Sequence, residues 1–273
     1  MHIAKRHLSE IIDLRHGGIA SLYTAKTSDN RRVVLRELQK QFIFKPRMHK
    51  FFVHGIRIRK KLSPCDYIVN SMSLGYSGLR PYEIIEYVPG KSLKQLMNSR
   101  HESIKANSLT ILKQVAKALN HMHNRYIVHL DVKPENILVI NNNKAGTSLK
   151  VKLTDFDLSR RCQSGFRGRL KAGTPSHMAP EQLTKGKVTP SNDIFAFGVL
   201  AYYLVTDRMP FSGFSLQEAR QKQISNKHQL KEPVRYNSDI SGNLNKLIMH
   251  CLEKDTSNRI PNMGYLCQQL ERI

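Results

Sequence analysis

The sequence has no apolar run long enough to cross a bilayer. Its longest, Ile194 to Val205, has twelve residues, whereas a membrane-spanning helix needs about 20, so this run is typical of a buried helix. Residues 1 to 10 mix basic side chains with apolar ones and contain no hydrophobic signal core. We therefore expect no transmembrane segment, no secretory signal, and a cytoplasmic, intracellular site of action.

Cysteine is scarce and scattered. The four cysteines show neither a CxxC spacing nor histidines at zinc-finger offsets; they are Cys65, Cys162, Cys251 and Cys267. This pattern argues against a disulfide framework and against a structural zinc site. We expect reduced thiols.

Acidic residues are also few. The chain has 21 Asp and Glu against 44 Lys and Arg, which gives a net charge of +23, and no acid occurs between Glu37 and Asp66. Eight bases occupy that interval: Lys40, Lys45, Arg47, Lys50, Arg57, Arg59, Lys60 and Lys61. Such a basic strip attracts an acidic protein or another polyanion, although an ordinary solvated face has the same composition.

The chain is long enough to bury a substantial core. Its 273 residues with 40% hydrophobic content fit one bilobal domain or two small ones. Short apolar runs between Ile11 and Leu38 predict hairpin strands, and Pro81 to Val88 predicts a buried strand. The pattern of Phe51 to Leu62 predicts a helix. The first part, about 1 to 88, is therefore expected to be mostly β.

The second part, about 89 to 273, has a mainly helical pattern. Residues Ser108 to His123 place their apolar side chains on one helical face. Two short strands are expected at Ile137 to Ile140 and Lys150 to Leu153, on either side of a polar insert, Asn141 to Ser148.

One ten-residue run carries chemistry: His129, Leu130, Asp131, Val132, Lys133, Pro134, Glu135, Asn136, Ile137, Leu138. Asp131 can accept the proton of an attacking hydroxyl, and Lys133 can meet charge on a transferring phosphoryl group. Asn136 can ligate a magnesium ion. The three side chains at these offsets indicate phosphoryl transfer.

Further motifs follow in order. Asp155, Phe156 and Asp157 begin 24 residues after Asp131, and Ala179, Pro180 and Glu181 close the segment beyond them. Over about residues 10 to 270 the chain resembles eukaryotic-like (Hanks-type) Ser/Thr protein kinases. This resemblance implies an α+β, bilobal protein-kinase-like fold in a single kinase domain, residues 1 to 273. It also implies ATP and Mg²⁺ (or Mn²⁺) as cofactors and protein substrates with Ser or Thr hydroxyls.

The resemblance also implies roles for particular residues. Asp131 would be the catalytic base beside Lys133, while Asn136 and Asp155 would hold the metal. Thr174 would form hydrogen bonds with Asp131 and Lys133. The nucleotide would be bound by Gly17, Leu22, Val34, Arg36, Glu86, Val88 and Leu138. In addition, Arg259 would pair with Glu181.

Three departures from the family pattern concern the phosphate site. Arg36 stands where the family has a lysine, and Gly55, or His54 one residue away, stands where it has the partner glutamate of the next helix. Asp157 replaces the glycine of the metal-binding motif. Arg36 would then pair with Asp155, or Lys26 would substitute as the phosphate-binding base. Lysine at position 36 is expected to be tolerated, because it restores a compact charge.

These observations support a protein kinase that transfers the γ-phosphate of ATP to Ser or Thr, with Asp131 as base. A pseudokinase that binds nucleotide or a partner as a scaffold stays open because of Arg36, the helix without an acid and an altered glycine-rich loop, in which Arg15 and Ala20 replace the first and third glycines around Gly17. The charge alone keeps open a polyanion-binding module on a kinase fold. Nothing in the pattern indicates an oligomeric state.

Overall fold

The computed structural model describes residues 4–140, 149–162 and 173–273. The chain forms two compact units. The first contains the residues up to Pro89 together with Thr154–Asp157, and the second contains Gly90–Leu153 and Leu158–Ile273. The first boundary lies next to the expected one, but the inclusion of Thr154–Asp157 in the first unit differs from the expected division at about residue 88.

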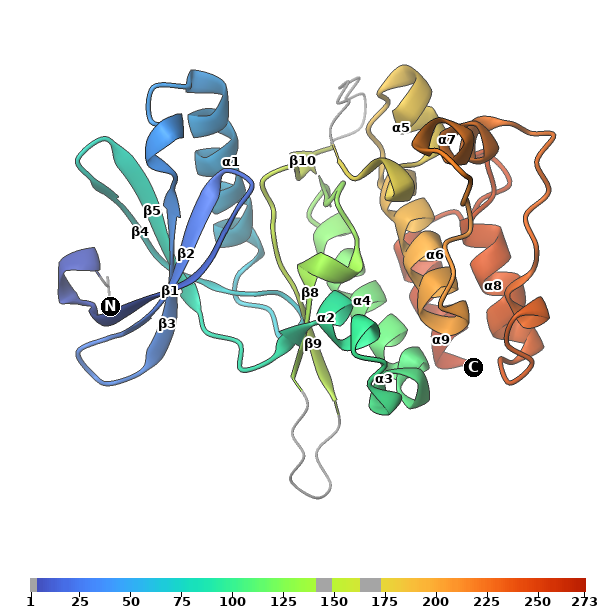
Figure 1. Ribbon diagram of the computed structural model, residues 1–273, viewed down its shortest axis with the longest axis horizontal. Helices are drawn as coiled ribbons and strands as arrows, with labels where there is room; N and C mark the ends of the chain where they lie inside the picture. Colours follow the sequence, from blue (N-terminus) through green and yellow to red (C-terminus); the bar gives the residue numbers. More distant parts are fainter. Residues whose placement is uncertain (1–3, 141–148, 163–172) are drawn as a thin grey trace. The chain divides into compact units, whose positions relative to one another are not determined.

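The first unit is built on an antiparallel sheet with strand order β1-β2-β3-β5-β4 (Figure 1). Its elements are β1 (Ser9–Gly17), β2 (Ala20–Lys26), β3 (Arg32–Leu38), α1 (Pro46–Leu62), β4 (Ser71–Ser77) and β5 (Arg80–Glu86). All residues of β3 except Arg32 are buried, because this strand is central in the sheet. The expected hairpin strands and the strand near Pro81 to Val88 are thus confirmed.

Side chains alternate between the two faces of this sheet, and each face has its own apolar cluster. Val33, Leu35 and Ile84 pack together in one cluster, whereas Leu38 packs with Phe52 and Ile56 of α1 in the other. Helix α1 begins five residues before the expected Phe51. Its first turn contains no buried residue and so shows no apolar period, but Pro46 occupies the first helical position, where proline is favoured.

The second unit is mainly helical (Figure 1). Its helices are α2 (Leu93–Asn98), α3 (Glu102–Ala106), α4 (Ser108–His123), α5 (Pro180–Lys185), α6 (Pro190–Thr206), α7 (Leu216–Ile224), α8 (Gly242–Cys251) and α9 (Met263–Glu271). Its short strands are β6 (Lys91–Ser92), β7 (Ile127–Val128), β8 (Ile137–Ile140), β9 (Lys150–Leu153) and β10 (Arg160–Arg161). They form two small sheets, β6-β8-β9 and β10-β7.

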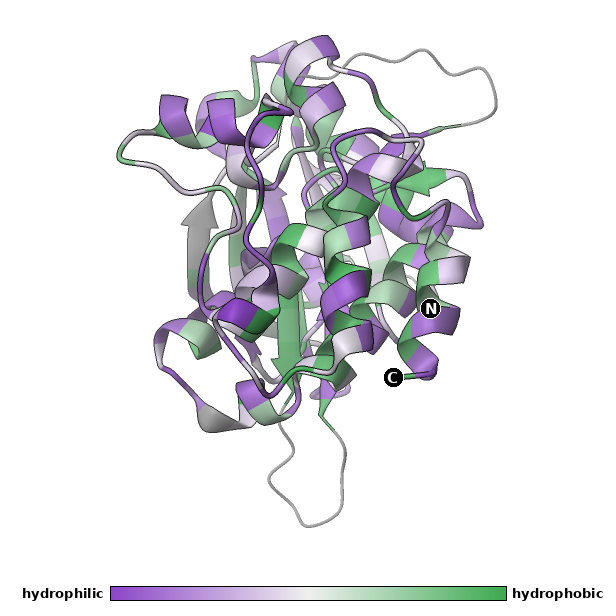
Figure 2. Cartoon of the chain, turned by 90° about the vertical axis from the view of Figure 1, so that its right-hand side faces the viewer, coloured by the Kyte–Doolittle hydropathy of each residue, from purple (hydrophilic) through white to green (hydrophobic). Residues whose placement is uncertain are grey.

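The bounds expected for α4, β8 and β9 are confirmed. The insert Asn141 to Ser148 lies outside the described residues. Helix α6, which contains the long apolar run, is buried along almost its whole length and begins with a capping box between Thr189 and Asn192. Other helix ribbons change between hydrophobic and hydrophilic colours in Figure 2, as helices with one buried face do. Within the described ranges, no helix is both long and apolar enough to cross a membrane.

The expected ion pair between Arg259 and Glu181 is confirmed in the second unit. Arg259 Nη1 lies 2.8 Å from Glu181 Oε1, and Nη2 lies 3.1 Å from Oε2. Nη1 also donates to the backbone carbonyl of Ser191. The bidentate geometry fixes α5 against the start of α6.

Candidate active site

The loop after β7 is held by the carboxylate of Asp193, near the start of α6. Its Oδ2 accepts a hydrogen bond from the backbone N–H of His129 and its Oδ1 accepts one from Leu130, both at 2.8 Å. Leu130 has φ 68°, in the left-handed region that non-glycine residues rarely adopt. The two hydrogen bonds hold this backbone conformation, which places Asp131 beyond the strand end.

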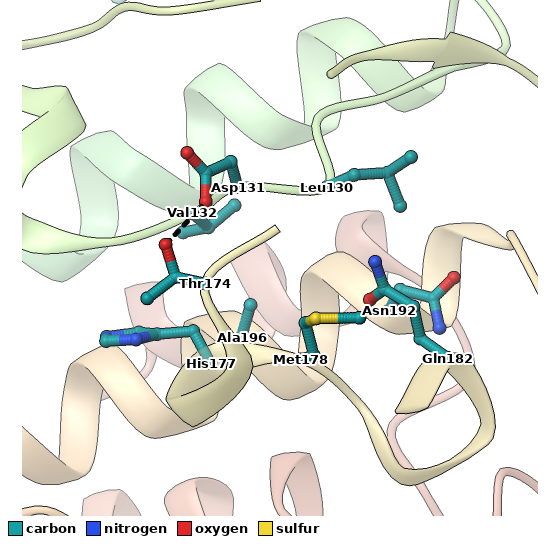
Figure 3. Close-up of a pocket in the computed structure, with 9 residues that line it drawn as sticks. All are labelled: Leu130, Asp131, Val132, Thr174, His177, Met178, Gln182, Asn192 and Ala196. Carbon is teal, nitrogen blue, oxygen red and sulfur yellow. Dashed lines mark hydrogen bonds between the residues drawn. The ribbon is translucent and has the colours of Figure 1, made fainter. Parts of the chain in front are cut away.

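Asp131, Lys133 and Thr174 form a closed hydrogen-bonded group. Thr174 Oγ1 donates to Asp131 Oδ1 at 2.9 Å, a bond drawn in Figure 3. Lys133 Nζ lies 2.7 Å from Asp131 Oδ2 and donates to Thr174 Oγ1 at 2.8 Å. The expected contacts of Thr174 with both residues are therefore confirmed. The group fixes the orientation of the carboxylate, which a general base requires.

The environment of Asp131 favours its charged form. Burial alone would raise the pKa of this carboxyl group, but the hydrogen bond and charge of Lys133, together with His129 and Thr174, lower it below its ordinary value. The side chain is therefore ionised at neutral pH, and it can orient a hydroxyl group and accept its proton.

Asn136 completes this part of the site. Its Nδ2 donates to the backbone carbonyl of Asp131 at 2.9 Å and to Asp131 Oδ2 at 3.0 Å. Because the amide nitrogen is committed to Asp131, Asn136 offers its Oδ1 as a ligand, and oxygen is the ligand that Mg²⁺ prefers. The other expected metal ligand, Asp155, is a carboxylate of the first unit with φ 66°. Each of the two side chains thus offers an oxygen donor of the kind that Mg²⁺ prefers.

A small pocket lies beside Asp131 (Figure 3). It is lined by Leu130, Asp131, Val132, Thr174, His177, Met178, Gln182, Asn192 and Ala196. Burial lowers the pKa of His177 to about 4 despite the nearby acids Glu135 and Asp131, so the ring is neutral at pH 7. The sequence assigned no role to His177, because the burial that keeps its ring neutral can be seen only in the structure.

Arg36 of β3 is buried, with 5% of its surface exposed. Its Nη2 forms an ion pair with Asp157 Oδ2, and its Nη1 lies 4.0 Å from Glu83 Oε2 on the opposite strand β5. Its guanidinium carbon lies 4.5 Å from the centre of the Phe52 ring of α1. The direct ionic partner of Arg36 is therefore Asp157, whereas the sequence suggested Asp155. Asp155 acts on Arg36 through its charge.

Lys26, the alternative base, pairs with Glu10 instead. The two side chains lie 2.8 Å apart and are partly exposed on the neighbouring strands β1 and β2. Arg36, and not Lys26, therefore forms the ion pair with Asp157.

The glycine-rich segment forms a tight hairpin. Gly17 ends β1 and faces Ala20, which begins β2. Between them, Gly18 has φ 57°, so the residue that needs glycine for its backbone is Gly18 rather than Gly17. The side chain of Arg15, next to this turn, lies outside the described residues.

The apolar residues expected to contact the nucleotide occur in both units. Leu22 faces Arg36 across the β2–β3 pair, and Val34 lies two residues before Arg36, so the three share one face of the sheet. The Glu86 carboxylate accepts hydrogen bonds from the N–H and the side chain of Asn70. Val88 is buried just after β5. Leu138 is half-buried on β8 of the second unit.

The basic strip needs one correction. Arg59 does not belong to its surface, because it is 1% exposed and forms an ion pair with the buried Glu83. The other seven bases are exposed. Arg47, Lys50, Arg57 and Lys61 follow one another at intervals of three, seven and four residues along α1, so they form a single stripe on one helix face, about 21 Å long.

Comparison with known proteins shows similarity to protein kinases. The family model for the protein kinase domain matches residues 10–270. A probable serine/threonine-protein kinase of Clostridium acetobutylicum is 30% identical over 260 residues, which cover 94% of this chain and 38% of that relative. A probable serine/threonine-protein kinase of Clostridium perfringens is 31% identical over 261 residues, which cover 94% and 37%.

The serine/threonine-protein kinase PrkC of Bacillus subtilis is 27% identical over 248 residues, which cover 89% of this chain and 37% of PrkC. The chain thus spans less than two fifths of the length of these relatives.

Proposed function

The chain belongs to the protein kinase family, and we propose that it transfers the γ-phosphate of ATP to Ser and Thr hydroxyls of protein substrates. The observation that carries this proposal is the closed group of Asp131, Lys133 and Thr174. Asp131 orients the substrate hydroxyl and accepts its proton, and Thr174 holds the carboxylate in place. Lys133 lies beside the carboxylate of Asp131 and neutralises the negative charge of the transferred phosphoryl group.

The residues that would hold the cofactors are those expected from the sequence. Asn136 and Asp155 would ligate Mg²⁺ or Mn²⁺. When bound, this metal ion neutralises negative charge on the phosphates. Arg36 would contact the phosphates. Leu22, Val34, Val88 and Leu138 would contact the adenine ring, Gly17 would approach the phosphates through its backbone, and Glu86 would offer its carbonyl to adenine.

The pseudokinase alternative drew support from Arg36 and from the helix that lacks an acid. The ion pair between Arg36 and Asp157 weakens that alternative, because the buried arginine has an acidic partner after all. A phosphate-binding base held by a carboxylate is what phosphotransfer requires of this position.

The proposal is tested by incubating the purified chain with γ-labelled ATP, Mg²⁺ or Mn²⁺, and protein substrates rich in Ser and Thr. We expect label in phosphoserine or phosphothreonine, on a substrate or on the chain itself, and none in phosphotyrosine. Binding of ATP without label transfer in either metal would instead support the pseudokinase. Label found mainly in phosphotyrosine would contradict the substrate class.

We further propose that the stripe on α1 binds an acidic segment of a partner protein. Its four exposed bases lie on one helix face over about 21 Å, a spacing that an acidic helix or an extended acidic peptide can match. Helix α1 contains no acid, so no neighbour on the same helix neutralises them.

Reversing Lys50, Arg57 and Lys61 to Glu should weaken binding of a poly-glutamate probe by about tenfold or more at low salt, because exposed charges are least screened there. The matched control reverses three exposed bases of the second unit, Lys227, Lys231 and Arg235. Equal losses in the two triple variants would show that only net charge matters. A loss restricted to heparin or nucleic-acid probes would favour the polyanion-binding alternative.

A further inference from the structure

Three residues that are far apart in the sequence meet in the first unit. The guanidinium group of Arg36 on β3 pairs with the carboxylate of Asp157. Asp157 in turn lies against Gly55 of α1, where a Cβ atom would be 2.3 Å from Asp157 Oδ1 and 3.1 Å from its Cα. Both the side chain and the backbone of Asp157 therefore occupy the space above Gly55.

Helix α1 supplies no carboxylate to Arg36, because its seventeen residues contain neither Asp nor Glu. The acid reaches Arg36 from the segment after β9 instead. A Cβ atom at position 55 would overlap the carboxylate of Asp157 and lie tightly against its backbone Cα and N, at 3.1 and 3.2 Å, so the carboxylate could not keep its place. Asp157 can therefore occupy its position beside Arg36 only if residue 55 has no side chain.

The guanidinium group is held on three sides. Phe52 covers its face at 4.5 Å, Asp157 binds Nη2, and Glu83 lies 4.0 Å from Nη1. A planar fork can bind Asp157 through Nη2 while its Nη1 faces Glu83, whereas a lysine ammonium is a single point charge. From this geometry we expect Arg36→Lys to lose part of these contacts, which differs from the tolerance expected from the sequence.

Asp157 also connects Arg36 to the backbone around Asp155. Phe156, between the two acids, is buried, and the guanidinium carbon of Arg59 lies 5.1 Å from its ring centre. These contacts place Thr154–Asp157 in the first unit. Asp155, which has φ 66°, lies two residues before Asp157 in this same packed segment.

We propose that Asp157 is a positioning residue that holds Arg36 toward the nucleotide phosphates, in the role of a helix carboxylate, and that Gly55 is required to leave room for it. The inference rests on the proposed function in that Arg36 must meet the phosphates of ATP. The carboxylate that pairs with the base on β3 thus comes from the metal-binding motif and not from α1. An acid at position 157 requires glycine at position 55, and the lack of an acid at position 55 is compensated by the acid at position 157.

The test is a reciprocal exchange measured by nucleotide binding. Asp157→Gly and Gly55→Glu are each expected to weaken ATP·Mg²⁺ affinity by about tenfold or more, the effect of losing a hydrogen bond to a charged group. Combined, Gly55→Glu/Asp157→Gly should recover most of the lost affinity, because the new carboxylate enters the space that Asp157 vacates. Binding of adenosine, which has no phosphates, should change little in any variant.

Asp157→Asn keeps the shape of the side chain and removes its charge, so it serves if Asp157→Gly does not fold. It should weaken ATP·Mg²⁺ binding as Asp157→Gly does. Asp29→Asn, an exposed acid of the same unit that pairs with Arg31, is the matched control and should leave ATP affinity unchanged.

Several results would overturn the proposal. They are ATP affinity within twofold of the unchanged chain in both Asp157 variants, a double variant no better than the worse single one, or an unchanged chain that binds ATP no more tightly than adenosine. These binding measurements do not require turnover. A chain that binds ATP but transfers no phosphate would contradict the proposed kinase activity, yet the single and double variants at positions 55 and 157 would still test the role of Asp157.

Discussion

Asp131→Asn is expected to lower kcat for phosphate transfer by about 10³-fold, within the range that removal of a general base produces. The amide has nearly the shape of the carboxylate, so the contacts with Thr174 and Asn136 can largely persist, but it cannot accept a proton. Affinity for ATP should change much less, because Asp131 faces the acceptor hydroxyl rather than the nucleotide. Steady-state kinetics combined with equilibrium ATP titration separates the two effects.

The matched control is Asp239→Asn, an exposed acid of the same unit that is remote from this hydrogen-bonded group. It should keep full activity. If Asp131→Asn retained more than about a tenth of wild-type kcat, a general base would not be needed at this position, and the proposed role of Asp131 would be wrong.

The largest effect on stability is expected from Glu83→Gln, which should lower the free energy of unfolding by about 3–5 kcal/mol. Glu83 is fully buried and pairs with Arg59, itself 1% exposed, and it lies 4.0 Å from Arg36. Without the carboxylate, two guanidinium groups remain buried near each other with less compensation. Urea denaturation of the purified chain measures the loss.

Two comparisons make this prediction specific. Glu10→Gln removes an exposed pair with Lys26 in the same unit and should cost less than about 1 kcal/mol, because solvent screens that pair. The double variant Arg59→Met/Glu83→Leu removes the buried pair as a whole and should be more stable than Glu83→Gln. A cost of Glu83→Gln no larger than that of Glu10→Gln would show that the buried pair does not hold the unit together.

The sequence predicted those features that depend on short stretches of chain. The bounds of α4, β8 and β9 followed from their apolar patterns, because a helix or strand with one buried face repeats every 3.6 or two residues. The closed group around Asp131 could also be foreseen, because the spacing of Asp131, Lys133 and Asn136 within one loop brings them together. Its partner Thr174 came from the family resemblance, as did the pair between Arg259 and Glu181.

The sequence also contained one signal that only the structure explains. An acid was missing from α1 at Gly55, and an unexpected acid stood at Asp157. The missing acid suggested a weakened phosphate site, whereas Asp157 suggested only a more restricted motif. That the second compensates for the first depends on Asp157 and Gly55 being neighbours in space, although they are about a hundred positions apart along the chain.

The sequence by itself therefore determined the family, the mostly β first part and mainly helical second part, and the chemistry of the loop at Asp131, because these follow from motifs, local periodicity and fixed spacing. Only the tertiary structure decided the partner of Arg36, the burial of Arg59 within an apparently basic strip, and the membership of Thr154–Asp157 in the first unit. The physical reason is that ion pairing and burial depend on which residues are neighbours in three dimensions. The order of charged residues along the chain does not show which of them is desolvated on folding.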